Sequence, residues 1–333
     1  HAQLRSLVYE ETSQVRRRLL HRRVADALAV NARRSGAESA STAAALANHY
    51  QLGGAIDKAA RWAASAGEQA RQVYANREAI AHFNLALALG AVAFGDAIPY
   101  VIHVNLGDLH TLQGEYAQAL DHYQIARQAC LIDDKNADAG YGKHSGKEGE
   151  IEHRLGRLQQ RLGDRTQAMQ HFARALQLLP ADAATQRALV LTDWSLAAYG
   201  AHDLSEAVRL AQAALAQAEA GSDLAVSARA HDILSLVERK QNNLPAALAH
   251  AELSLQAAAK LHDPAAELAA LNSLALAHAA AGAPDQAISI LYAALERCMR
   301  LGDRHQEAAL RNNLADLYHA TGQHAAAMEE LKR

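Results

Sequence analysis

An alanine that recurs about every 40 residues limits the possible folds of this chain more than any other feature. In the second half the positions are Ala168, Ala207, Ala247, Ala287 and Ala327, separated by 39, 40, 40 and 40 residues. Upstream of each alanine stands a bulky residue followed by a small one. A period of this length is typical of one supersecondary unit copied along the chain. Because such an array grows by adding units, 333 residues do not have to close around a single core.

Composition indicates that the copied unit is helical. Alanine is abundant, the chain has only 5 Pro, and runs of β-branched residues are almost absent. Alanine is the best helix former, and its small side chain lets helices pack closely, whereas strands favour β-branched and aromatic residues. We therefore expect helices throughout and no sheet.

The unit over residues 152–180 is the clearest copy. Its motif residues are, in order, Leu155-Gly156, Ala168, Phe172, Ala175 and Pro180. These spacings resemble those of a tetratricopeptide repeat, a pair of antiparallel helices that cross at small residues. The resemblance implies an all-α fold, a right-handed superhelix (α-solenoid) of roughly 40-residue repeats. It also predicts that Phe172 and the recurring alanines are buried.

The first half of the chain is less regular. Ala119 and Ala168 are 49 residues apart, and the extra length coincides with a segment rich in glycine, lysine and acidic residues. We predict a flexible inserted loop at about 133–150 within a repeat array over residues 46–333. Residues 1–45 are expected to form a separate N-terminal helical segment.

Charge is distributed unevenly along the chain. Residues 1–34 contain eight arginines and three acidic residues, a local charge of +5, so the remainder carries −8 of the net −3. The basic segment could meet phosphate, acidic lipid or an acidic neighbouring domain, or it could be a solvated helix face. We favour the solvated or intramolecular alternative, because nucleic-acid binders usually add base-stacking aromatic residues to a larger basic surface.

The N-terminal motifs resemble a stretch that follows the ATPase module of large bacterial STAND-type regulators. These motifs are Leu4-Arg5-Ser6-Leu7-Val8-Tyr9-Glu10, Arg16-Arg17-Arg18-Leu19-Leu20-His21-Arg22-Arg23-Val24-Ala25, Leu46-Ala47-Asn48-His49-Tyr50 and Ala59-Ala60-Arg61-Trp62-Ala63. The family includes MalT-like and AfsR-like transcriptional activators and ATPase–cyclase fusions. The resemblance implies that residues 1–45 link to an upstream ATPase module. It also implies that the repeats act as a sensor arm for an inducer or a partner protein.

Sequence motifs for catalysis or for cofactor binding are absent. No G-x-x-x-x-G-K-[ST] phosphate loop is present, and the 18 histidines form neither H-E-x-x-H nor another common metal-binding spacing. The two cysteines, Cys130 and Cys298, are far apart and do not suggest a disulfide framework. We therefore expect no enzyme activity and no cofactor. No membrane span and no direct nucleic-acid contact are expected, and a cytoplasmic location fits best.

A binding surface is predicted from the repeat frame. In a tetratricopeptide array the first helix of each unit lines the concave side, and its second, fifth, ninth and twelfth motif positions share one face. The candidates are Glu150, His153, Arg157, Gln160, Thr192, Tyr199, Arg229, Asp232, Arg239, Asn272, Asn312, Asp316 and His319. Their side chains suit a protein or peptide partner, with a small-molecule inducer as the other possibility.

Two functions remain open at this point. The first is the regulatory sensor arm of a STAND-type ATPase, and the second is a free-standing tetratricopeptide scaffold that joins protein partners. The sequence upstream of His1 would distinguish them. The identity of the ligand, the oligomeric state and the output domain cannot be read from these residues.

Overall fold

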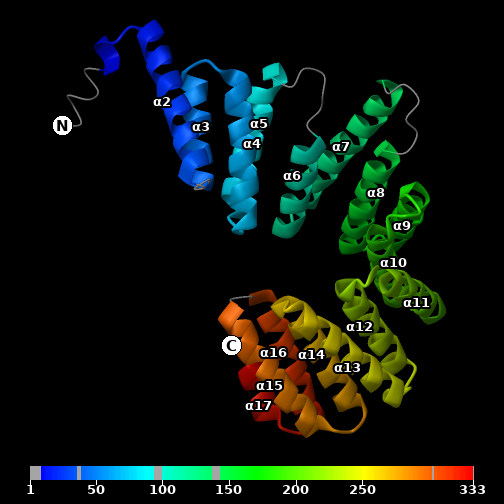
Figure 1. Cartoon of the computed structure of the whole chain (residues 1–333). Coiled ribbons are helices and arrows are strands. Elements are labelled where there is room, and N and C mark those ends of the chain that lie inside the picture. Colours follow the sequence, from blue (N-terminus) through cyan, green and yellow to red (C-terminus); the bar gives the residue numbers. More distant parts are fainter. Residues whose placement is uncertain (1–8, 36–38, 94–99, 137–142, 302–303, 333) are drawn as a thin grey trace. The chain divides into compact units, whose positions relative to one another are not determined.

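The computed structural model describes residues 9–35, 39–93, 100–136, 143–301 and 304–332, and every regular element within these ranges is a helix (Figure 1). The chain divides into two compact units, a first unit over His1–His144 and a second unit over Ser145–Arg333. The predicted all-α repeat fold is therefore confirmed. No helix in the described ranges carries an apolar stretch long enough to cross a membrane.

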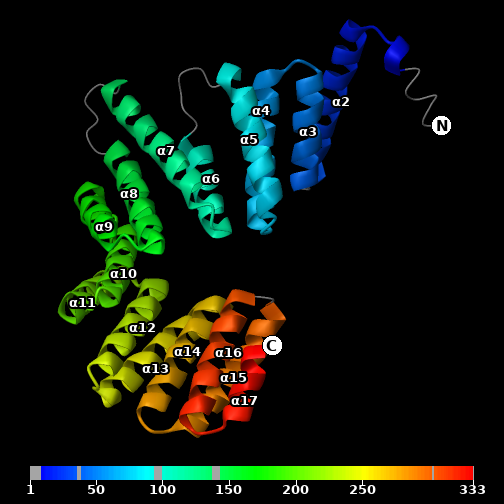
Figure 2. The same cartoon turned by 180° about the vertical axis from the view of Figure 1, so that it is seen from behind.

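The helices follow one another as antiparallel neighbours within each unit. The first unit contains α2 (Gln14–Ser35), α3 (Ala40–Leu52), α4 (Ile56–Gln72), α5 (Asn76–Ala93), α6 (Tyr100–Gln113) and α7 (Tyr116–Asn136). The second contains α8 (Lys143–Leu162) from its third residue onward, α9 (Arg165–Leu178), α10 (Ala184–Gly200), α11 (Leu204–Gly221), α12 (Leu224–Lys240), α13 (Leu244–Leu261), α14 (Pro264–Ala280), α15 (Pro284–Leu301), α16 (Arg304–Ala320) and α17 (His324–Lys332). Both views show α12 to α17 packed side by side (Figures 1 and 2).

One left-handed residue forms the turn inside each helix pair. Glycine occupies this position in four repeats, while Tyr74, His202 and Asn242 occupy it in the others with φ of 60–64°. In two repeats of the second unit an aspartate, Asp164 or Asp203, follows the left-handed residue and caps the next helix by accepting a backbone N–H bond. The left-handed residue ends one helix, and the carboxylate satisfies an otherwise unpaired donor at the start of the next.

Small residues and aromatic residues are matched where the two helices cross. At Gly156 an added Cβ would lie 2.6 Å from the ring of Phe172. In later repeats Ser195 and Ser235 replace this glycine, and each hydroxyl donates to a carbonyl of the opposite helix, at 2.6 and 2.8 Å. A side chain therefore fits at this crossing in repeats whose partner position carries alanine rather than an aromatic ring.

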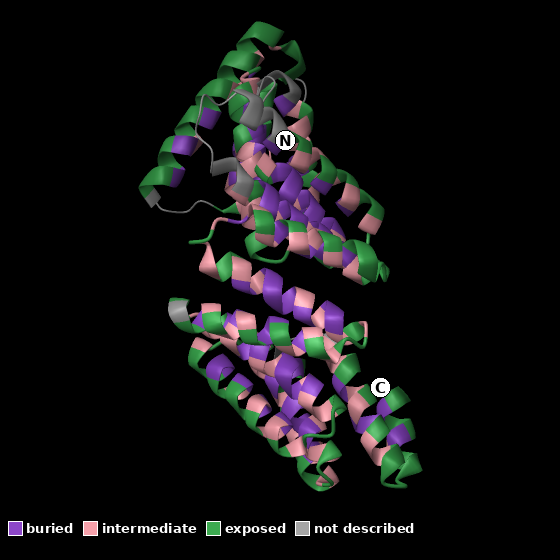
Figure 3. Ribbon diagram, turned by 90° about the vertical axis from the view of Figure 1, so that its right-hand side faces the viewer, coloured by how far each residue is buried: buried purple, intermediate pink, exposed green. Residues whose placement is uncertain are grey.

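The recurring motif residues form the core, as predicted. The motif side chains Ala168, Phe172, Ala175, Ala207, Ala247 and Ala287 are all fully buried. Buried residues follow the contacts between helices, while exposed residues cover the outer faces (Figure 3). The repeat frame read from the sequence is thus the packing frame of the structure.

The predicted flexible loop at 133–150 is wrong for most of its length. The helix α7 continues to Asn136, and α8 begins at Lys143. Glu148 and Gly149 are buried, and Gly149 lies against Leu179. Gly149, one of the glycines that suggested a loop, allows close packing instead. Residues 137–142 lie outside the described ranges, and the proposed boundary at residue 45 falls inside α3.

The second unit is curved. The first helix of each repeat, as in α10, α12, α14 and α16, lies on the inner side of the curve. The helix α12 contacts both α10 and α14, and α14 also contacts α16. Among the described residues, consecutive second helices such as α11 and α13 make almost no direct contact. Because the first helices lie closer together than the second helices do, they form the inner layer of the curve. This is the layer on which the sequence places its candidate residues.

Candidate functional site

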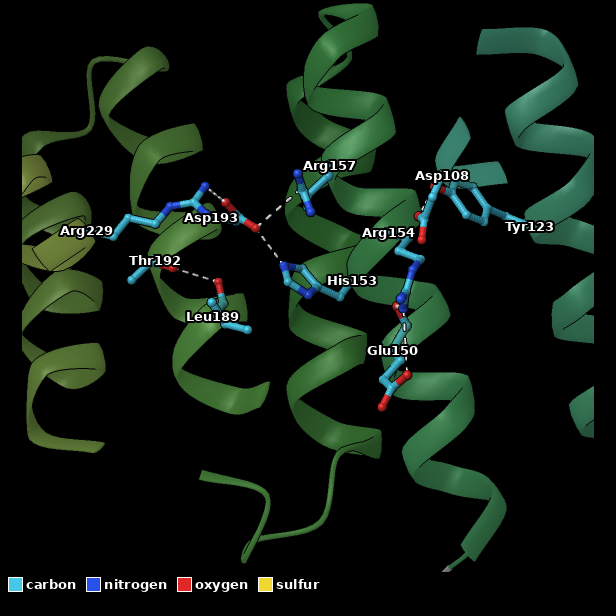
Figure 4. Close-up of polar contacts among 10 residues, drawn as sticks. All are labelled: Asp108, Tyr123, Glu150, His153, Arg154, Arg157, Leu189, Thr192, Asp193 and Arg229. Carbon is cyan, nitrogen blue, oxygen red and sulfur yellow. Dashed lines mark hydrogen bonds and ion pairs between the residues drawn. The ribbon is translucent and has the colours of Figure 1, made fainter. Parts of the chain in front are cut away.

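The inner layer carries a polar network centred on Asp193. This aspartate lies on α10 and is 3% exposed. The Nε2 of His153 on α8 donates to its Oδ2 at 2.7 Å, and the guanidinium of Arg229 on α12 donates to its Oδ1 (Figure 4). The Nε of Arg157 on α8 lies 3.6 Å from Oδ2. One carboxylate therefore holds side chains from the repeats on either side of its own.

Asp193 stays ionised in spite of its burial. Burial alone would raise its pKa, but the hydrogen bond from His153 and the charges of Arg229 and Arg157 outweigh that effect and lower the pKa below 3.8. The side chains of Arg157 and Arg229 are 49% and 40% exposed. The network thus fixes one side of each guanidinium and leaves further N–H donors facing outward.

A second polar group continues the layer toward the C-terminus. The amide of Asn313 on α16 donates to Asn272 Oδ1 on α14 at 2.7 Å. On α12, the Asp232 carboxyl accepts a bond from Ser273, yet its Oδ1 is buried without a partner. Burial raises the pKa of Asp232 to about 6, although Ser273 and Arg229 act in the opposite direction. Polar side chains therefore run through five successive first helices.

The remaining candidates contribute in different ways. Glu150 pairs with Arg154 on the same helix at 3.7 Å, and Tyr199 packs against the apolar core of α10 to α12. Gln160 and Arg239 are partly exposed, and Asn312, Asp316 and His319 are exposed on α16. The candidate Thr192 is wrong, because it is fully buried and its hydroxyl donates to the Leu189 carbonyl at 2.8 Å. Its side chain offers nothing to a ligand.

The sequence reasoning missed Asp193, which is next to Thr192. The frame assigned inward-facing roles to the fifth motif position, while Asp193 occupies the sixth. The equivalent residue of the next repeat is Ile233, a buried core residue. A lone carboxylate in the apolar sequence of α10 was the available signal, because a charge at a core position requires partners.

Comparison with known families supports the repeat frame. Residues 266–333 and 153–182 match tetratricopeptide-repeat family models. The chain therefore contains tetratricopeptide repeats. A search of curated protein sequences finds no match.

Several solved structures share the fold. The apo form of RapI has 12% sequence identity and a TM-score of 0.67, with 82% of this chain and 95% of that chain covered. Aspartyl phosphate phosphatase F from Bacillus subtilis has 13% identity and a TM-score of 0.67, with 87% and 73% covered. A STAND protein with a tetratricopeptide-repeat sensor from Pyrococcus horikoshii has 15% identity and a TM-score of 0.56, with 81% and 38% covered. At these identities the likeness shows the fold alone.

Proposed function

We propose that the inner layer of the second unit binds an extended segment of a partner protein and that the chain is the regulatory sensor arm of a STAND-type ATPase. The Asp193 network carries the binding proposal. The N-terminal motifs and the fold of the STAND protein with a tetratricopeptide-repeat sensor support the regulatory role. Under this proposal the upstream partner is the ATPase module, and the protein acts in the cytoplasm without catalysis of its own.

The energetics of Asp193 favour a role in recognition. A buried ion pair gains little stability over apolar residues of similar volume, because desolvation offsets the attraction between the charges. The chain uses Ile233 at the equivalent position of the next repeat, so an apolar solution was available. What the carboxylate adds is orientation: it holds Arg157 and Arg229 in place before a partner arrives. Such preorganisation reduces the entropy cost of binding.

The chemistry of the layer suits an extended polypeptide. Arginine N–H groups can bond carbonyl or carboxylate oxygens, and the Asn272–Asn313 pair offers both donors and acceptors. A partner strand that crosses several first helices would contact one repeat after another. A small-molecule inducer is the alternative ligand, and a free-standing scaffold is the alternative role.

A displayed random-peptide library tests the binding proposal. Peptides selected on the wild-type protein are expected to bind Arg157→Ala more weakly by about 1–3 kcal/mol, through loss of a charge-assisted hydrogen bond. Titration calorimetry with a selected synthetic peptide would measure the difference. Arg157→Ala should leave thermal stability nearly unchanged, because the Asp193 carboxylate keeps His153 and Arg229.

Arg209→Ala is the matched control for this change. Arg209 lies on α11, is exposed, and pairs with Glu206 on the same helix at 2.6 Å. Its removal should leave peptide affinity unchanged. Equal affinity of wild type, Arg157→Ala and the Arg157/Arg229/Asn272 triple alanine variant would move the site elsewhere, with the basic N-terminal helix as the next candidate.

A further inference from the structure

In each repeat from α6 to α17, one residue of the first helix is paired with one residue of the second helix. The types of these two residues differ from repeat to repeat. The first residue lies in the first helix, and the second follows it by 19 residues in the second helix. In the six repeats from α6 to α17 the pairs are His103–His122, Glu152–His171, Leu191–Leu210, His231–His250, Leu271–Ile290 and Arg311–Glu330. We call each of these residue pairs a joint. The joint is apolar in two repeats, pairs an acid with a base in two, and pairs two imidazoles in two.

The two histidine pairs have nearly the same geometry. The Nδ1 atoms of His103 and His122 are 2.9 Å apart, and those of His231 and His250 are 3.1 Å apart. In each pair the ring centroids are 5.2 Å apart. His103 is buried, and the other three rings are partly buried. At this distance one Nδ1–H donates to the other Nδ1, which must be unprotonated.

Protonation of both rings removes this contact. The first added proton leaves one donor and one acceptor, so the hydrogen bond can persist. The second places two N–H groups and two positive charges face to face at hydrogen-bond distance, and the rings must separate. The apolar pairs Leu191–Leu210 and Leu271–Ile290 contain no titratable group. A change of pH therefore acts on some joints and leaves others unaffected.

The charges around the His231–His250 pair do not offset the repulsion between two protonated rings. Burial lowers the pKa of both His231 and His250 below 6.5. The negative charge of Glu219 on α11 raises the pKa of His231, and that of Glu238 on α12 raises the pKa of His250, but neither outweighs burial. The neighbouring imidazole lowers the pKa of His231 further.

The pair in the first unit has a different set of neighbours. Burial, followed by the charges of His103 and His110, lowers the pKa of His122 to about 4, while Asp121 acts in the opposite direction. His110 itself stacks on His122 and bonds Glu115 at 2.6 Å. Burial also lowers the pKa of His103.

We propose that these histidine pairs are acid-sensitive joints, so that the packing of α6 on α7 and of α12 on α13 loosens below neutral pH while the leucine joints stay closed. The proposal concerns the repeats themselves and does not depend on any ligand. A group whose pKa is lowered on folding stabilises the fold above its unfolded pKa and loses that contribution as pH falls. For these histidines the loss begins near pH 6.5 and continues to about pH 4 for His122.

Amide hydrogen exchange of the whole chain, expressed as protection factors at pH 7.5 and 5.5, tests the proposal. Protection of α6 and α7 is expected to fall up to about tenfold, the factor that follows from a pKa of about 4 instead of 6.5. Protection of α12 and α13 should fall in the same direction. The helices α14 and α15, joined by Leu271 and Ile290, should keep their protection.

A double variant supplies the control. His231→Leu with His250→Ile copies the Leu271–Ile290 joint and should remove the acid sensitivity of α12 and α13. NMR titration of the wild-type histidine rings gives a second measurement that needs no variant. Parallel loss of protection in α12–α13 and α14–α15, or ordinary titration of all four rings near pH 6.5, would overturn the proposal.

Discussion

Phe172→Ala is expected to lower the free energy of unfolding of the second unit by about 3–5 kcal/mol. The ring is fully buried and fills the space that Gly156 leaves between α8 and α9. It also packs in a cluster with Val190 and Ala197 of α10, so its loss opens a cavity at the contact between two repeats. Chemical denaturation followed by circular dichroism would measure the change.

Leu253→Ala is the matched control for this substitution. Leu253 lies on α13 and is 42% exposed, so its truncation removes little buried surface. A change within about 0.5 kcal/mol is expected, as for surface substitutions generally. A loss for Phe172→Ala as small as that for Leu253→Ala would show that the motif aromatic is not the core of this repeat.

Removal of both His153 and Arg229 should be the most damaging change to the polar network. The double alanine variant leaves Asp193 buried with only the guanidinium of Arg157, at 3.6 Å. Removing the partners of a buried charge costs about 3–5 kcal/mol, because its desolvation is no longer compensated. Thermal or chemical unfolding would report the loss.

A rescue variant separates this electrostatic effect from simple loss of packing. Asp193→Ile, which copies Ile233 of the next repeat, should restore most of the stability when added to the double variant. The rescued protein should nevertheless bind selected peptides weakly, since Arg229 is absent and Arg157 is no longer oriented. If Asp193→Ile fails to restore stability, the loss comes from packing rather than from an unpaired charge.

The fold was predictable because the repeat constrains many positions at once. Each recurring alanine must be small where two helices cross, so its spacing shows directly which helices pair. Gly149 misled the prediction for a related reason. A glycine indicates either a turn or a close approach of two helices, and only the position of Leu179 shows that Gly149 serves the second purpose.

The polar network of the inner layer was predictable only in part. Helical spacing assigns His153, Arg157 and Arg229 to the inner layer, because these positions share one helix face. It cannot show that they converge on Asp193, since that contact joins three repeats and depends on how adjacent repeats pack. The same limit explains the error at Thr192, which sits one residue away from the buried carboxylate. The histidine joints also need the structure, because nothing local links residues 19 apart.

Site-specific photocross-linking to a selected peptide tests the central claim most directly. A photoreactive residue would replace Gln160 or Asn312 on the inner first helices α8 and α16, and in parallel Gln212 or Gln256 on the second helices α11 and α13. Gln212 and Gln256 are exposed, so any peptide bound to the outer face would reach them. The inner-layer account predicts cross-links from positions 160 and 312 and none from 212 and 256. Cross-links from the second helices alone would contradict it.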